Sequence, residues 1–193
     1  MNNIAILGSG AGSNALKILE YFQKSKTADV VCIISNKPEA GILEHAKKFG
    51  VVSKVFENAV WESHSDKVIA FLDLHNVDAI VLAGFLRKIP TKILDRFEGA
   101  IINIHPSLLP KYGGKGMYGR RVHRAVVENG DDESGITIHL VNEIYDDGEI
   151  LFQAKTKIDA TDSPTDVQHK VQQLEHKHFA PVVEKFLLNR QSR

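Results

Sequence analysis

Short apolar runs recur along the first half of the chain, and their spacing limits the available folds more than any other feature of the sequence. The runs are largely apolar and partly β-branched, as are strands that are buried on both faces of a parallel sheet. Between the runs lie stretches in which apolar residues recur at three and four positions, as in a helix packed on one side. This alternation predicts βαβ units and an α/β fold. The predicted strands are 4–7, 30–34, 51–56, 79–83 and 100–104, and the predicted helices are 13–24, 41–49, 65–75 and 90–96.

The pattern changes in the second half of the chain. A stretch containing glycine and proline, 106–119, precedes a predicted helix over 120–129, which ends at a turn around Gly130. Two strands then follow, 135–141 and 149–158, and the loop between them is so short that they should pair antiparallel.

A last helix should open at Pro164 and run to about residue 188, with Pro181 bending or dividing it. The sequence therefore predicts a single domain over residues 1–193. Its fold class is α/β, a Rossmann-like and mostly parallel twisted sheet with flanking helices and a C-terminal antiparallel strand pair.

Composition and charge limit the classes of partner that the chain can bind. Hydrophobic residues at 43% and charged residues at 25% are ordinary for a soluble globular protein. The 24 lysines and arginines balance the 24 aspartates and glutamates, so no net charge attracts nucleic acid or an anionic membrane. No stretch approaches the roughly 18 apolar residues of a membrane span, and no signal peptide precedes the first strand. We expect a cytoplasmic protein with a small-molecule partner, and the sequence makes no prediction of oligomeric state.

The single cysteine, Cys32, lies inside the second apolar run. A structural disulfide within the chain is therefore impossible, and we expect a reduced and inert core thiol.

The segment 8–14, Gly-Ser-Gly-Ala-Gly-Ser-Asn, connects the first predicted strand to the first helix. Glycines allow a tight turn, and the amides at a helix start bind anions. A dinucleotide fingerprint would need glycine in place of Ser13 and an acidic residue after the second strand, where residues 35–37 read Ser-Asn-Lys. A Walker A loop fails because no Gly-Lys-Ser/Thr follows. Two alternatives remain, a loop for one phosphate with Ser13 and Asn14 as side-chain donors, or a structural tight turn.

Asn103 and His105 lie at the carboxyl end of the fifth predicted strand, which is the edge where open α/β sheets bind ligands. Side chains alternate along a strand, so these two point to the same face. An amide donor and an imidazole that converge would stabilise an oxyanion during acyl transfer. The alternative is that both only satisfy backbone groups at the start of a loop.

The acidic loop 142–148 connects the last two predicted strands. Such a hairpin loop is usually a solvated turn. If it folds over the sheet edge instead, a carboxylate near His105 would favour the charged imidazole and complete a set of Asn, His and carboxylate. No serine or cysteine nucleophile is then required, because a substrate amine could attack by itself.

The nine histidines raise the question of a metal site. His169, His176 and His178 share the last predicted helix, but their spacing does not bring them to one face, and no His-x-x-x-His or paired cysteines occur. We predict no metal. A basic cluster could meet phosphate or nucleic acid, or be a solvated helix face. Its members are Lys115, Arg120, Arg121 and Arg124.

The most specific motif is the segment 103–110, Asn-Ile-His-Pro-Ser-Leu-Leu-Pro. Other motifs precede and follow it in order: 10–14, 35–37, 83–87, 135–141 leading to Asp146, and 171–172 with 175–176. Together they resemble the folate-dependent formyltransferases, and within that family the members that act on glycinamide ribonucleotide. The match covers nearly the whole chain and implies the formyltransferase fold.

The resemblance implies transfer of the formyl group of 10-formyltetrahydrofolate, as cosubstrate, to the amine of glycinamide ribonucleotide in purine biosynthesis. By position, Asn103, His105 and Asp146 match the family's catalytic trio. In that trio Asn and His stabilise the tetrahedral oxyanion, while Asp keeps His charged and helps to move the amine proton through water. The residues that match the substrate-binding positions are Gly12, Ser13 and Asn14 for the phosphate, and Gln172 and Glu175 for the ribose hydroxyls. The positions that match the folate pocket are Leu86, Arg87, Ile89, Val141 and the loop 143–148, with Glu143 and Asp147.

Two segments depart from the family pattern. Asp147 and Glu149 stand where a small residue and a proline are commoner, and the segment 113–119 is longer and richer in glycine than usual. The longer segment fits either a mobile cover on the site or ordinary loop variation.

Three rival functions are disfavoured. A methionyl-tRNA formyltransferase would need an added nucleic-acid domain and a basic surface, and a formyltetrahydrofolate hydrolase typically has a second histidine where Pro106 stands. A binding module of the same fold that catalyses no reaction should have lost at least one member of the trio, and Asn103, His105 and Asp146 are all present.

Overall fold

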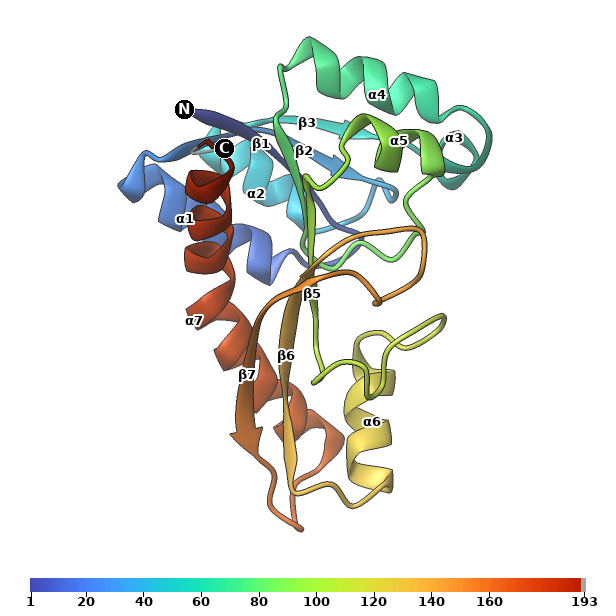
Figure 1. Cartoon of the computed structure of the whole chain (residues 1–193), viewed down its shortest axis with the longest axis vertical. Coiled ribbons are helices and arrows are strands. Elements are labelled where there is room, and N and C mark those ends of the chain that lie inside the picture. Colours follow the sequence, from blue (N-terminus) through green and yellow to red (C-terminus); the bar gives the residue numbers. More distant parts are fainter. Residues whose placement is uncertain (192–193) are drawn as a thin grey trace. The chain divides into compact units, whose positions relative to one another are not determined.

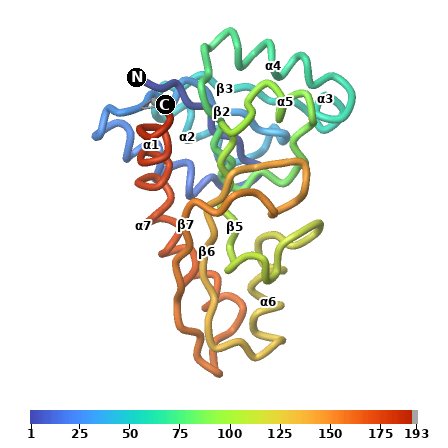
Figure 2. Tube along the Cα trace, in the orientation of Figure 1, coloured from blue at the N-terminus to red at the C-terminus, as the bar shows by residue number. Residues whose placement is uncertain are grey.

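The computed structural model describes residues 1–191, which form two compact units (Figures 1 and 2). Of the described residues, the first unit contains 1–102 and 183–191, and the second contains Asn103–Val182. Within the described residues, no helix combines the length and the hydropathy that a membrane span requires.

Seven strands form one mixed sheet in the order β3-β2-β1-β4-β5-β6-β7. β1 pairs in parallel with β2 and β4, and β2 with β3, whereas β6 and β7 pair antiparallel. This mostly parallel sheet with a C-terminal antiparallel pair confirms the predicted fold class. The strands are β1 (Asn2–Leu7), β2 (Ala28–Ser35), β3 (Val52–Val55), β4 (Ala79–Leu82), β5 (Ile101–His105), β6 (Glu133–Leu140) and β7 (Ile150–Lys157).

The first unit is doubly wound, with α1 and α2 on one side of its strands and α4 and α5 on the other (Figure 1). Its helices are α1 (Ser13–Ser25), α2 (Ile42–Phe49), α3 (Asn58–Ser63), α4 (Ser65–Leu74) and α5 (Thr91–Arg96). The chain runs outward from β1 to β2 and β3 and then returns to place β4 on the other side of β1. The loops after β1 and β4 therefore flank the switch point at which doubly wound sheets bind ligands.

Two details of the first unit differ from the sequence-based predictions. The expectation that the run 51–56 is buried on both faces was wrong, because β3 is the edge strand and its Val52 is 49% exposed. The short helix α3 was not predicted, since six residues are too few to establish a helical period. Its buried Trp61 anchors it by donating a hydrogen bond from Nε1 to the Phe56 carbonyl at 2.8 Å.

The second unit contains α6 (Arg120–Glu128), the β6–β7 hairpin and the first part of α7 (Pro164–Gln191). Gly130 has a φ of 66° and follows α6 as the predicted turn. The hairpin pairs Ile138 with Phe152 and then His139 with Ile150, so its register shifts by one residue there. The extra, unpaired residue is Leu151 of β7, so β7 is the bulged strand and the bulge lies opposite Ile138 and His139.

The last helix begins where the sequence predicts. Ser163 and Asp166 exchange hydrogen bonds, with the Ser163 amide donating to Asp166 Oδ2 at 2.9 Å and the Asp166 amide donating to Ser163 Oγ at 3.3 Å. The helix continues through Pro181, so the alternative of division there was wrong. The residues flanking the proline are buried, and their burial offsets the one backbone hydrogen bond that proline lacks. They are Phe179, Ala180 and Val183.

Candidate active site

Two polar side chains of β5 lie at its carboxyl end, in the second unit. Asn103 is half-buried and His105 is only 4% exposed. The alternation of side chains along the strand directs both to one face, as predicted.

Both ring nitrogens of His105 have defined neighbours. Nε2 lies 2.8 Å from the backbone carbonyl oxygen of Tyr112, and Nδ1 lies 3.5 Å from Oδ2 of Asp146. A carbonyl oxygen can only accept, so Nε2 carries a hydrogen in both charge states of the ring. The other ring nitrogen, Nδ1, faces the carboxylate.

Asp146 turns inward from a loop whose other acidic residues are exposed. Its backbone is left-handed, with a φ of 56°, and its side chain is 12% exposed. Oδ2 accepts a hydrogen bond from the Gly114 amide at 2.8 Å. Of the two alternatives for the acidic loop, the structure shows the one that brings a carboxylate beside His105.

His139 of β6 also belongs to this cluster, and the sequence analysis missed it. Its Nδ1 lies 2.8 Å from the Leu140 carbonyl oxygen, and its Nε2 lies 3.1 Å from Nδ2 of Asn103 and 3.7 Å from Oδ1 of Asp146. Burial lowers the pKa of His139, and the charge of His105 acts in the same direction, against the raising effects of the Leu140 carbonyl and Asp146. A neutral ring protonated at Nδ1 can accept from the Asn103 amide at Nε2, which fixes which way that amide points.

A sequence signal for His139 did exist. Thr137 and His139 are two residues apart in the otherwise apolar predicted strand 135–141, so they share one face of it. Thr137 accepts from the Leu109 amide at 2.9 Å and donates to the Ser107 carbonyl at 2.7 Å. It thus supports the turn that follows β5.

The four side chains form a continuous chain of contacts, from Asn103 to His139, Asp146 and His105. The cluster combines an oriented amide, an imidazole and a carboxylate beside its Nδ1. Such a set can stabilise a negative oxygen and hold a proton close to it.

The glycine-rich loop belongs to the first unit, where Gly12 is the N-cap of α1 and has a φ of 78°. A Cβ on Gly12 would lie 2.8 Å from both Cα and Cβ of Ile42, so only glycine fits. No side chain caps the helix at this position. The first amides of α1 follow this left-handed glycine, and amides at a helix start can bind an anion.

Ser9 ties together the loops after β1, β2 and β4. Its hydroxyl donates to Oδ1 of Asn36 at 2.6 Å and accepts from the Leu86 amide at 2.9 Å. Asn36 then donates to Oδ1 of Asn58 at 2.9 Å. Three motifs that are far apart in the sequence thus form one hydrogen-bonded edge of the first unit.

The other predicted site residues lie in both units. In the first, Leu86 is 47% exposed, Ile89 is buried, and Arg87 pairs with Glu62 of the unpredicted helix α3. In the second, Val141 is half-buried, whereas Glu143 and Asp147 are exposed. Gln172 and Glu175 are half-buried and share a face of α7, being three residues apart.

The histidines of α7 and the basic cluster remain outside this geometry. Within residues 1–191, no three His, Cys, Asp or Glu side chains are grouped as metal ligands would be. The four basic side chains are exposed, and Arg121 packs over the ring of Tyr118 with its guanidinium carbon 5.1 Å from the ring centroid.

A mostly parallel α/β sheet with a glycine-rich loop after β1 and a polar cluster at the end of β5 defines a Rossmann-like domain with a candidate oxyanion site. Residues 2–183 match the model of the family described as formyl transferase. The chain belongs to this family, and the resemblance inferred from its motifs is confirmed.

Relatives from plants and bacteria carry one name, phosphoribosylglycinamide formyltransferase. The Arabidopsis thaliana chloroplastic protein is 41% identical over 185 residues, which are 93% of this chain and 63% of the relative. The Escherichia coli (strain K12) protein is 35% identical over 188 residues, which are 95% of this chain and 86% of the relative. The chain thus spans less than two thirds of the plant relatives, 63% for Arabidopsis thaliana and 59% for Vigna unguiculata.

Solved structures have the same fold. The glycinamide ribonucleotide transformylase 1 of Symbiobacterium toebii has a TM-score of 0.91 at 29% identity, covering 98% of this chain and 89% of that one. The phosphoribosylglycinamide formyltransferase of Brucella melitensis has a TM-score of 0.87 at 34% identity, covering 96% and 95%.

Proposed function

We propose that this chain transfers the formyl group of 10-formyltetrahydrofolate to the amine of glycinamide ribonucleotide. The observation that carries the proposal is the contact chain of Asn103, His139, Asp146 and His105, because it provides the groups that formyl transfer requires. The shared name of relatives at 34–41% identity supports the same reaction.

The reaction needs no nucleophile from the protein. The substrate amine attacks the formyl carbon, a C–N bond forms, and the carbonyl electrons move to the oxygen. Asn103 donates an amide N–H to this oxygen, and the protonated Nδ1 of His105 supplies positive charge beside it. The tetrahedral intermediate then collapses, the bond from carbon to N10 of the folate breaks, and N10 takes up a proton.

Asp146 has two roles in this mechanism. Its carboxylate, 3.5 Å from Nδ1, stabilises the imidazolium form of His105. It also accepts, through water, the proton that the attacking amine must lose.

His139 orients Asn103. Because the neutral Nε2 accepts from one N–H of the amide, the other N–H is free to face the reacting oxygen, and the carbonyl end of the amide is directed away. This arrangement pre-organises an oxyanion donor before the substrate arrives.

The substrate-binding assignments follow the family resemblance. We assign the nucleotide phosphate to Gly12, Ser13 and Asn14, a choice supported by the left-handed glycine at the N-terminus of α1. The ribose hydroxyls are assigned to Gln172 and Glu175. The folate positions are Leu86, Arg87, Ile89, Val141, Glu143 and Asp147.

An absorbance assay with a formylated folate analogue tests the proposal. Loss of the formyl group should require glycinamide ribonucleotide and should yield one formylated nucleotide for each deformylated folate. Deformylation at the same rate without the nucleotide would instead indicate a hydrolase. Binding of the analogue with no turnover in either case would indicate a binding module.

A further inference from the structure

The turn that follows β5 contacts both partners of the cluster's central pair. The Tyr112 carbonyl oxygen lies 2.8 Å from Nε2 of His105, and the Gly114 amide donates to Oδ2 of Asp146 at 2.8 Å. Two residues of the short segment 112–114 therefore hold the imidazole at one nitrogen and the carboxylate that faces its other nitrogen. The conformation of this short segment decides how the pair is aligned.

Tyr112 occupies a backbone conformation that tyrosine disfavours. Its φ is 57°, in the left-handed region where a residue with a Cβ is uncommon. Such a conformation persists only where surrounding contacts hold it. We therefore expect the side-chain contacts of Tyr112 and of its neighbour Lys111 to direct the Tyr112 carbonyl toward His105.

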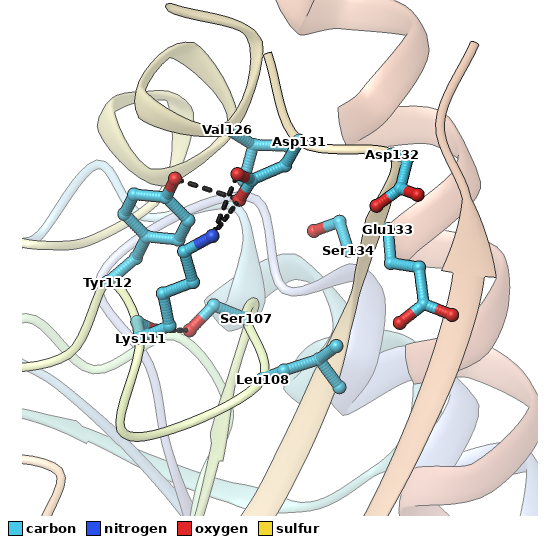
Figure 3. Close-up of a pocket in the computed structure, with 9 residues that line it drawn as sticks. All are labelled: Ser107, Leu108, Lys111, Tyr112, Val126, Asp131, Asp132, Glu133 and Ser134. Atoms are coloured by element: carbon cyan, nitrogen blue, oxygen red, sulfur yellow. Dashed lines mark hydrogen bonds and ion pairs between the residues drawn. The ribbon is translucent and has the colours of Figure 1, made fainter. Parts of the chain in front are cut away.

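Both side chains converge on Asp131, just after α6. Lys111 Nζ lies 2.7 Å from each carboxylate oxygen of Asp131, and the Tyr112 hydroxyl donates to Oδ2 at 2.8 Å. Asn129 adds a third donor, with Nδ2 at 2.6 Å from Oδ1. Figure 3 shows the contacts of Lys111 and Tyr112 with Asp131, which line a cavity of about 170 Å³. None of the four cluster residues lines this cavity.

Asp131 is well suited to hold a backbone conformation. Its side chain is only 10% exposed, whereas that of Lys111 is 56% exposed. Burial raises the pKa of the Asp131 carboxyl, but the hydrogen bonds from Lys111, Asn129 and Tyr112 outweigh burial and leave this pKa below its ordinary value. The carboxylate is therefore charged at neutral pH and accepts from the side chains of two consecutive residues of the turn.

We propose that Asp131 is a positioning residue for formyl transfer, which holds Tyr112 so that its carbonyl keeps the hydrogen of His105 on Nε2 and leaves Nδ1 facing Asp146. The inference rests on the proposed function. Asp131 acts through Tyr112 and has no contact with the reacting groups in this scheme. Weakening the contacts of Asp131 should let the Tyr112 carbonyl turn away and free the ring to adopt the other tautomer.

An ordinary ion pair at the same end of β6 provides the control. Glu133 and Lys155 are paired at 2.9 Å with side chains 51% and 64% exposed, and Glu133 lines the same cavity. Neither side chain contacts Lys111 or Tyr112 in the interactions of the described residues. Glu133→Gln therefore removes a neighbouring charge without touching the turn.

The experiment compares Asp131→Asn, Tyr112→Phe and Glu133→Gln by steady-state kinetics. We expect kcat to fall about tenfold or more in the first two, as for other residues that orient an active-site group. The KM of both substrates should change little, and Glu133→Gln should leave kcat unchanged. The double variant Asp131→Asn with Tyr112→Phe should be no slower than the slower single variant, since both act through one contact.

Nitrogen-15 NMR of the His105 ring gives a second readout that needs no turnover. The wild-type neutral ring should carry its hydrogen on Nε2, protected from solvent exchange, and both Asp131→Asn and Tyr112→Phe should show mixed tautomers or faster exchange. If the wild-type chain transfers no formyl group, the proposed function fails, and the ring spectrum still decides whether Asp131 positions His105.

Two outcomes would overturn the inference. One is a kcat equal to that of the wild type, together with an unchanged His105 ring spectrum, in both Asp131→Asn and Tyr112→Phe. The other is an equal loss of kcat in Glu133→Gln, which would indicate a general effect of charge near the cavity. If Asp131→Asn does not fold, Tyr112→Phe decides alone, because it keeps the pair of Lys111 and Asp131 and removes only the hydroxyl.

Discussion

Replacement of Asp146 by asparagine removes a charge 3.5 Å from Nδ1 of His105 while it preserves the shape of the side chain. The asparagine oxygen can still accept from the Gly114 amide, which lies 2.8 Å from Oδ2. Asparagine also tolerates the left-handed backbone that Asp146 adopts, with a φ of 56°. The loop should therefore keep its conformation, and the variant isolates the effect of charge.

The distance sets an upper bound on that effect. Two unit charges at 3.5 Å attract each other by about 5 kcal/mol at an effective dielectric constant of about 20. Partial exposure of the carboxylate, at 12%, reduces the attraction through solvent screening. We expect kcat to fall by about 10²- to 10³-fold, the loss that follows removal of one oxyanion donor, about 3 to 4 kcal/mol.

The assay is formyl transfer at saturating concentrations of both substrates, with Asp147→Asn as the matched control. Asp147 is adjacent and carries the same charge, but it is exposed. Its replacement should change kcat by no more than about twofold, because the assay is at saturating folate and Asp147 is assigned to folate binding rather than to the reacting groups; any effect should appear in KM for the folate. The KM values of Asp146→Asn should change much less than kcat, because neither substrate loses its main anchor. A crippled Asp147→Asn beside a nearly normal Asp146→Asn would refute the assignment of the catalytic carboxylate.

Three further predictions concern the loop, the core and acid stability. Gly12→Val should raise KM for the nucleotide about tenfold or more, and KM for the folate much less, because a Cβ would lie 2.8 Å from Cα of Ile42; equal effects on both substrates would contradict the phosphate assignment. Burial raises the pKa of the Cys32 thiol to about 12, so a thiol reagent at pH 8 should label the unfolded chain but not the native one, and rapid native labelling would contradict the buried position. Burial, with a smaller effect of the charge of His105, lowers the pKa of His123 from 6.5 to about 4. The unfolded chain therefore binds this proton more tightly than the folded chain, and the free energy of unfolding decreases as pH falls from about 6.5 toward 4. This loss should reach about 3 kcal/mol in urea unfolding and should be absent in His123→Leu; an equal acid loss in that variant would assign the effect to other groups.

The sheet could be predicted from the sequence because its buried strands are apolar on both faces. β1 and β4 have fully buried residues throughout their paired segment, so each appears as an uninterrupted apolar run. The same rule failed for the burial of β3, where Ser53 and Lys54 interrupt the apolar run and the edge position leaves Val52 exposed. A run of apolar residues reports strand propensity, and position within the sheet depends on pairing partners that lie far away in sequence.

The polar cluster was only partly predictable. Asn103 and His105 share a strand, where the period of two fixes their common face. The position of Asp146 depends on a left-handed backbone at that residue, and the sequence alone favoured a solvated turn. His139 was missed because a lone histidine in an apolar strand resembles an ordinary buried residue, although Thr137 on the same face gave a second polar position.

Backbone groups explain the part of the cluster that the sequence could not indicate. His105 is held by the carbonyl of Tyr112 and Asp146 by the amide of Gly114, and neither group depends on the identity of the side chain that carries it. The backbone conformation that directs these two groups does depend on side chains. For the Tyr112 carbonyl, the side chain that holds this conformation is Asp131, which accepts from the Tyr112 hydroxyl. A substitution remote from the reacting atoms can therefore alter the protonated nitrogen of His105, while a substitution at Gly114 that keeps its backbone conformation need not. For this reason we expect the kinetic effect of substitutions in the turn 111–114 to follow their effect on the His105 tautomer rather than their distance from the substrate.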